Sequence, residues 1–180
     1  MNTMPDALHA GTTLVLGGAR SGKSGFAEKL ARETGLKRVY VATAQAFDAE
    51  MRERIDKHRN DRARDQWRTV EEPINLARVI MQEPKPDTVL LVDCLTLWLS
   101  NVMLAERDVA AMQSELLNGI GNAAGPIIFV SNEVGMGLVP ETPLGRKFRD
   151  AQGRLNQAIA ARVPHVVFVA AGLPLILKQA

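Results

Sequence analysis

The most definite chemistry in this sequence lies at residues 17–24, which fit the phosphate-binding consensus G-x-x-x-x-G-K-S/T. The motif consists of Gly17, Gly18, Ala19, Arg20, Ser21, Gly22, Lys23 and Ser24. An apolar run at 12–16 precedes it and a helix-like stretch at 26–31 follows, so the loop N–H groups and the positive helix end would face one anion. We expect a nucleoside triphosphate there, with Lys23 on its β- and γ-phosphates and the Ser24 hydroxyl on Mg²⁺.

A second chemical feature is an acidic residue that directly follows an apolar run at 88–92. Asp93 in this position could ligate Mg²⁺ directly or through water, contact a ribose hydroxyl, or cap the following helix. Thr43, Ala44 and Gln45 follow another apolar run in the same way. Since ligands of open parallel sheets bind beyond the carboxyl ends of the strands, we expect these residues to lie beside the phosphate loop.

A histidine in a basic, helix-like stretch at 48–64 is the third feature. His58 is seven residues from Met51 and three from Ile55, which predicts that its imidazole faces the body of the protein. The basic residues around it are Arg52, Arg54, Lys57, Arg59, Arg62 and Arg64. Nearby cations disfavour the protonated imidazole, and the neutral ring can attack phosphorus. On this pattern alone, a packing or surface histidine on a solvated basic face is the alternative.

Apolar runs that alternate with helical stretches must position these residues. The runs lie at 12–16, 38–42, 88–92, 126–131 and 165–170. Their near-continuous apolar character predicts an α/β fold of the P-loop nucleotide-binding type, with a mostly parallel central sheet flanked by helices. Apolar spacing over 144–162 predicts a helix with one face on the sheet, ended by Pro164.

Composition limits the class of protein. The chain has 180 residues, 46% hydrophobic and 23% charged, which fits one globular domain at 11–180 after a flexible arm at 1–10. A formal net charge of +2 does not indicate nucleic-acid binding. The single cysteine, the lack of a secretory signal and the lack of a bilayer-length apolar run lead us to expect a cytoplasmic protein with no membrane span.

Several further segments accompany the phosphate loop. They are 40–44, 50–55, 58–71, the stretch SNEVGMGLVP at 131–140, and 146–157. Together with the loop, they make the chain similar, almost from end to end, to the bifunctional adenosylcobinamide kinase/adenosylcobinamide-phosphate guanylyltransferase family of cobalamin biosynthesis.

The resemblance implies a two-step catalyst. The first step would phosphorylate the aminopropanol hydroxyl of adenosylcobinamide with ATP or GTP. The second would transfer GMP from GTP to adenosylcobinamide phosphate through a guanylyl-histidine intermediate, giving adenosylcobinamide-GDP and pyrophosphate. By the resemblance, His58 and Lys23 are catalytic, and Ser24 and Asp93 hold Mg²⁺. The implied nucleotide-binding residues are the loop 17–24, Thr43, Ala44, Gln45, Arg59, Asn60, Asp61, Arg62, Glu71 and Asp93.

Some points stay open at this level. Asp93 stands where the family often has Glu, and a one-residue longer interval between Arg62 and Trp67 leaves Glu72 as an alternative to Glu71. The glycine-flanked apolar loop at 132–140 fits a subunit interface or a corrinoid contact, and the resemblance suggests a homotrimer. A kinase without guanylyl transfer and a nucleotide-dependent regulatory module are the alternative functions.

Overall fold

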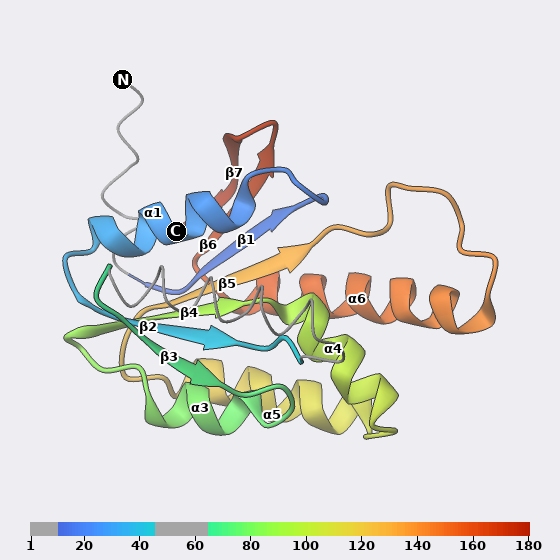
Figure 1. Ribbon diagram of the computed structural model, residues 1–180, viewed down its shortest axis with the longest axis horizontal. Coiled ribbons are helices and arrows are strands. Elements are labelled where there is room, and N and C mark those ends of the chain that lie inside the picture. The colour runs from blue at the N-terminus through green and yellow to red at the C-terminus, as the bar shows by residue number, and fades with distance from the viewer. Residues whose placement is uncertain (1–10, 46–64) are drawn as a thin grey trace.

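A seven-stranded sheet forms the centre of the protein in the computed structural model, which describes residues 11–45 and 65–180 (Figure 1). The strands are β1 (Thr13–Gly17), β2 (Lys37–Ala42), β3 (Trp67–Glu71), β4 (Thr88–Asp93), β5 (Ile127–Asn132), β6 (His165–Ala170) and β7 (Leu173–Gln179). Their order is β3-β2-β4-β5-β1-β6-β7, and only the β6–β7 pair is antiparallel. The predicted α/β fold with a mostly parallel sheet is therefore confirmed.

Helices cover both faces of this sheet. They are α1 (Lys23–Glu33), α3 (Leu76–Gln82), α4 (Leu95–Leu104), α5 (Val109–Gly121) and α6 (Pro143–Arg162). Helix α1 packs on one face, and residues of the other four share a core on the opposite face (Figure 1). Among the described residues, no helix combines the length and apolarity needed to cross a membrane.

Successive residues of the central strands enter different cores, as the two-residue period of a strand requires. In β4, Leu90 and Val92 join the core under α3–α6, whereas Val89 and Leu91 join the core under α1. Because both faces of these strands are buried, their sequences are continuous apolar runs and do not alternate between apolar and polar residues.

The five predicted strands and the helix at 144–162 agree with the observed ones to within one residue at each end, whereas α1 is longer than the expected stretch 26–31. Two strands were not predicted. Strand β3 lies at the edge of the sheet and carries exposed polar residues such as Arg68, so it lacks a continuous apolar run. Strand β7 follows β6 through a two-residue turn, Ala171 and Gly172, whose φ angles of 49° and 77° suit a tight hairpin. The expected arm at 1–10 lies outside the described residues.

Candidate active site

Six parallel strands end at one edge of the sheet, which we call the carboxyl edge. Backbone hydrogen bonds join the segments that leave it: Glu133 N donates to Gly17 O (3.0 Å), and Gly172 N donates to Ser21 O (2.8 Å). Thr43 N likewise donates to Asp93 O (3.4 Å). The carboxyl edge therefore brings the phosphate loop, the residues after β2 and the acidic residue at the end of β4 together.

Two glycines of the phosphate loop are required by its surroundings. A Cβ on Gly17 would lie 2.5 Å from both Ser21 Oγ and Val169 O. Gly22 has a φ of 94°, and its Cβ would approach Gly172 Cα to 3.0 Å. Side chains at either position would collide with the loop itself or with the end of β6 and its turn, so the consensus glycines reflect close backbone packing.

The loop offers mostly hydrogen-bond donors. Helix α1 begins at Lys23 without a side-chain cap and without an acidic residue in its first turn, which leaves its amino end suited to an anion. Lys23 Nζ donates to Gly18 O (3.1 Å), and the buried hydroxyl of Ser21 has no hydrogen-bond partner in the structure. Arg20 is exposed in the same loop. This arrangement is able to bind phosphate groups.

Asp93 lies at the end of β4 and is partly exposed. Its Oδ2 accepts a hydrogen bond from the Tyr40 hydroxyl (3.1 Å). The residue that caps helix α4 is Cys94, whose Sγ accepts from Leu97 N (3.5 Å), and burial first, then the charge of Asp93, raise the pKa of this thiol. Because Cys94 provides the cap, Asp93 is not needed for that role.

The residues after β2 differ in what they can offer. The Thr43 hydroxyl is fully buried; it donates to Cys94 O (2.7 Å) and accepts from Cys94 N (2.8 Å). Asn101 Nδ2 donates to Thr43 O (2.7 Å). Thr43 thus ties the ends of β2 and β4 together, whereas Ala44 and Gln45 are partly exposed at the carboxyl edge.

The two candidate glutamates at the end of β3 have different surroundings. The Glu72 carboxylate is buried and accepts hydrogen bonds from Ile74 N (3.0 Å), Asn75 N (2.8 Å) and Arg78 (3.1 Å). Burial opposes its ionisation, but the Asn75, Ile74 and Arg78 hydrogen bonds outweigh this and lower the pKa of Glu72. Glu72 therefore holds the start of α3, and the exposed Glu71 is the better placed of the two for a nucleotide.

Five predicted site residues lie outside the described part of the chain. They are His58, Arg59, Asn60, Asp61 and Arg62. Gln45, the last described residue before this segment, lies at the carboxyl edge, since it follows β2.

The described residues fit a magnesium ion that arrives with a nucleotide better than a resident metal. Among them, no group of three or more His, Cys, Asp or Glu side chains is placed to hold a metal ion. Mg²⁺ bound to a nucleotide needs only one or two protein oxygens, because phosphates and water supply the rest. Ser24 and Asp93 each offer one at the carboxyl edge.

A polar network behind the site was not predicted. The Ser131 hydroxyl donates to Asn156 Oδ1 (2.7 Å), and Gln152 Nε2 donates to both Ser131 Oγ and Asn156 Oδ1 (2.9 Å each). Asn156 Nδ2 donates to Asn132 O (3.1 Å) at the end of β5. The signal available in the sequence was a glutamine beside Ala151 and Leu155 on the apolar face of the predicted helix.

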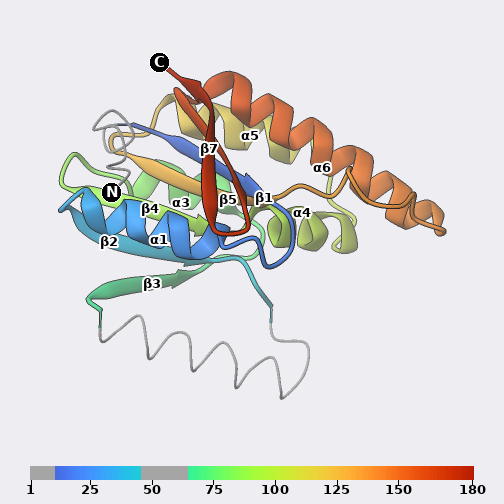
Figure 2. The same cartoon turned by 90° about the horizontal axis from the view of Figure 1, so that it is seen from above.

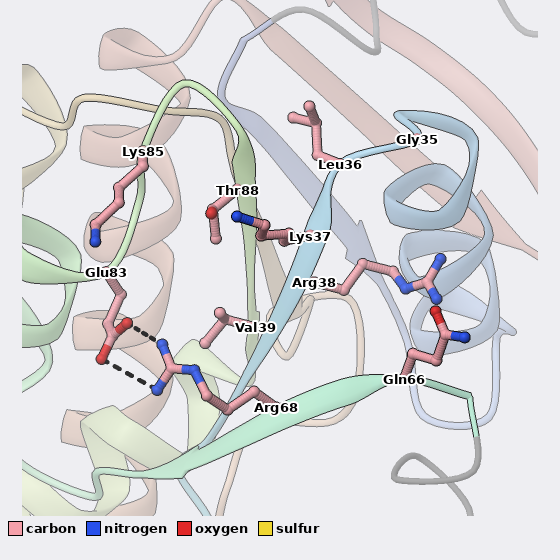
Figure 3. A pocket seen from close by; sticks show the side chains of 10 residues that line it. All are labelled: Gly35, Leu36, Lys37, Arg38, Val39, Gln66, Arg68, Glu83, Lys85 and Thr88. Atoms are coloured by element: carbon pink, nitrogen blue, oxygen red, sulfur yellow. Dashed lines mark hydrogen bonds and ion pairs between the residues drawn. The ribbon is translucent and has the colours of Figure 1, made fainter.

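A hollow of about 500 Å³ lies at the opposite edge of the sheet, where β2, β3 and β4 begin (Figure 3). Two of the cations that line it are paired with carboxylates: Arg68 with Glu83, and Lys37, whose Nζ lies 2.7 Å from Asp87 Oδ2. This hollow is therefore separate from the site at the carboxyl edge, and much of its positive charge is neutralised.

Comparison with protein families supports an enzyme of corrinoid metabolism. Residues 13–177 match the sequence model of the family described as cobinamide kinase / cobinamide phosphate guanyltransferase. The bifunctional adenosylcobalamin biosynthesis protein CobP of Pseudomonas aeruginosa is 51% identical over 167 residues, which cover 92% of this chain and 96% of that protein. The corresponding protein CobU of Escherichia coli is 38% identical over 180 residues, with 92% and 98% covered.

Similarity to solved structures supports the fold alone. The RadB recombinase superposes with a TM-score of 0.51 at 17% identity, covering 89% of this chain and 74% of that one. A second solved structure, an ATPase domain, gives a TM-score of 0.51 at 11% identity, covering 89% and 69%. Both neighbours agree with a P-loop nucleotide-binding architecture.

Proposed function

Because the chain belongs to the cobinamide kinase / cobinamide phosphate guanyltransferase family, and so is a bifunctional enzyme of adenosylcobalamin synthesis, we propose that both of its reactions take place at the carboxyl edge. The observation that carries this proposal is the donor-rich phosphate loop, with Asp93 on a nearby strand of the same edge. The substrates are adenosylcobinamide for the kinase step and adenosylcobinamide phosphate for the guanylyl transfer.

In the kinase step, ATP or GTP binds with its phosphates on residues 17–24. Lys23 exchanges its hydrogen bond to Gly18 O for the β- and γ-phosphate oxygens, where its charge offsets the charge that develops on the transferred group. Ser24 and Asp93 would hold Mg²⁺, which would offset the negative charge of the phosphates. The hydroxyl oxygen of the aminopropanol arm of adenosylcobinamide attacks the γ-phosphorus, and the bond from this phosphorus to the β–γ bridging oxygen breaks. The nucleoside diphosphate departs with the electrons of that bond, and the hydroxyl proton passes to solvent.

In the second step, a nitrogen of the neutral His58 imidazole attacks the α-phosphorus of GTP, and pyrophosphate leaves with the electrons of the broken P–O bond. A phosphate oxygen of adenosylcobinamide phosphate then attacks the same phosphorus. The imidazole is released unchanged, and the product is adenosylcobinamide-GDP. Nucleotide contacts come from Ala44, Gln45 and Glu71, and from the segment Arg59, Asn60, Asp61 and Arg62, while the buried Thr43 holds the ends of β2 and β4 in place behind them.

The assembly proposed for the enzyme is a homotrimer. Exposed apolar residues form two separate surfaces: the loop before α6 with Met136, Leu138 and Val139, and strand β7 with Leu173, Leu175 and Leu177. The loop and the start of α6 project away from the body of the molecule (Figure 2). Contact between two different surfaces of neighbouring copies is head-to-tail and closes into a ring when the rotation permits.

Covalent labelling tests the guanylyl-histidine step. After incubation with GTP radiolabelled at the α-phosphate and denaturation, we expect acid-labile, alkali-stable label on the wild-type chain and none on His58→Ala. His165→Asn, a change at a buried histidine at the start of β6, is the matched control and should keep the label. Unlabelled wild-type protein that still phosphorylates adenosylcobinamide would contradict guanylyl transfer through the enzyme and support the kinase-only alternative.

A further inference from the structure

Tyr40 is a buried aromatic residue that reaches the proposed site from a neighbouring strand. It lies in the middle of β2, opposite Leu91 of β4, and is 6% exposed. Tyr40 and Leu91 belong to the core under α1. Asp93 lies two residues beyond Leu91, so the strand period places it on the same face, where the tyrosine hydroxyl reaches its carboxylate.

The tyrosine ring is held from a second direction. Trp67, at the start of β3, packs edge-on against Tyr40, with ring centroids 6.1 Å apart and an interplanar angle of 86°. A buried ring fixed between two strands and a tryptophan has little freedom to move. This packing therefore holds the hydroxyl in place to donate to Asp93 Oδ2, 3.1 Å away.

We infer that Tyr40 is a positioning residue that orients the Asp93 carboxylate toward the magnesium-nucleotide. This inference rests on the proposed role of Asp93. A phenol is neutral and protonated near pH 7, so it donates to Asp93 Oδ2 and leaves Oδ1 as the oxygen for Mg²⁺ or a water bound to it. Outer partners of this kind fix the orientation of ligating carboxylates, and their loss weakens metal binding.

Metal affinity tests the inference without depending on turnover. Mn²⁺, observed by electron paramagnetic resonance, is titrated into the full chain in the presence of a non-hydrolysable GTP analogue. Tyr40→Phe keeps the ring and removes only the hydroxyl, so we expect Mn²⁺ affinity about tenfold weaker than wild type. In kinase assays, the Mg²⁺ concentration for half-maximal rate should rise, and kcat at saturating Mg²⁺ should stay close to wild type.

Two further variants separate the explanations. Trp67→Phe keeps the Tyr40 hydroxyl and an aromatic neighbour for its ring, so its Mn²⁺ affinity should fall much less than that of Tyr40→Phe. An equal loss would show that ring packing, and not the hydroxyl, supports metal binding and would overturn the inference. Asp93→Asn should weaken Mn²⁺ at least as much as Tyr40→Phe. Normal affinity in Tyr40→Phe with weak affinity in Asp93→Asn would refute the Tyr40 role alone, whereas normal affinity in both would also refute the proposed metal role of Asp93.

Discussion

Individual residues at the carboxyl edge differ in how deeply the protein buries them. The hydroxyl of Thr43 and the carboxylate of Glu72 are buried and fully engaged with neighbouring groups. Asp93 and Gln45 are partly exposed, and Glu71 is exposed. The two adjacent glutamates thus differ in burial. Neighbouring residues of a strand point to opposite sides, and only Glu72 bonds to the backbone at the start of α3.

The buried carboxylate predicts a pH-dependent contribution to stability. The folded-state pKa of Glu72 lies below its ordinary value of 4.5, so the folded protein binds fewer protons than the unfolded chain. The stabilisation is complete above pH 4.5 and is lost as the pH falls through the folded-state pKa. We expect Glu72→Gln to lower the free energy of unfolding at pH 7 by about 1–3 kcal/mol, with the difference shrinking below pH 4.5.

Denaturant unfolding followed by circular dichroism at several pH values measures this effect. Glu141→Gln, at an exposed glutamate before α6, is the matched control and should change the free energy of unfolding by less than about 0.5 kcal/mol. A Glu72→Gln deficit that stayed constant from neutral to acidic pH would show that the carboxylate charge is not its source.

Among the elements, α6 and β5 are joined by polar contacts as well as by apolar packing. The network of Ser131, Gln152 and Asn156 fixes α6 against the end of β5, where Glu133 N bonds to the first glycine of the phosphate loop. A displacement of α6 would therefore shift the end of β5 and, with it, the phosphate loop. The network therefore connects the packing of α6 with the geometry of the proposed nucleotide site.

Asn156→Ala should be more costly than Gln152→Leu. Removing the Asn156 amide takes a hydrogen-bond partner from Ser131, from Gln152 and from Asn132 O, which we expect to lower the free energy of unfolding by about 2–3 kcal/mol and to weaken GTP binding. Gln152→Leu loses two donated hydrogen bonds but also removes a buried Oε1 that has no partner, so its cost should stay below about 1.5 kcal/mol.

Chemical denaturation and calorimetric titration of GTP check both variants. Gln157→Ala, at an exposed position on the same helix, controls for changes in helix propensity and should match wild type in both measurements. Equal stability losses in Asn156→Ala and Gln152→Leu would contradict the proposed hierarchy of the network.

At the scale of the whole molecule, exposed apolar surface predicts self-association. Leu138 is 96% exposed in the loop before α6. A lysine at a buried centre of an interface removes apolar contact and leaves an unpaired charge, so Leu138→Lys should weaken self-association at least tenfold. Light scattering across a concentration series measures the mass.

Leu104→Lys is the control, because Leu104 is also exposed but lies on α4 and belongs to neither proposed surface. It should leave the mass unchanged. A wild-type mass equal to one chain at all concentrations would refute the assembly, and a trimer insensitive to Leu138→Lys would move the interface elsewhere.

The sequence was sufficient for the central fold and for the position of the phosphate loop because those parts follow local rules. A doubly covered strand such as β4 is a continuous apolar run, and the loop 17–24 has a fixed spacing of glycines and a lysine. Strand β3 was missed because an edge strand alternates, and β7 because a two-residue turn replaces the helix that joins parallel strands. Tyr40 and Gln152 were missed because their roles depend on contacts between distant segments.

The position of β1 has a consequence for synthesis on the ribosome. This first strand lies between β5 and β6, and its phosphate loop is held by the turn at Gly172. A nascent chain that carries the nucleotide-binding motif cannot close it until nearly all later elements have emerged. Strand β1 is therefore made before both of its neighbours in the sheet, and it must stay unpaired without aggregating until they emerge.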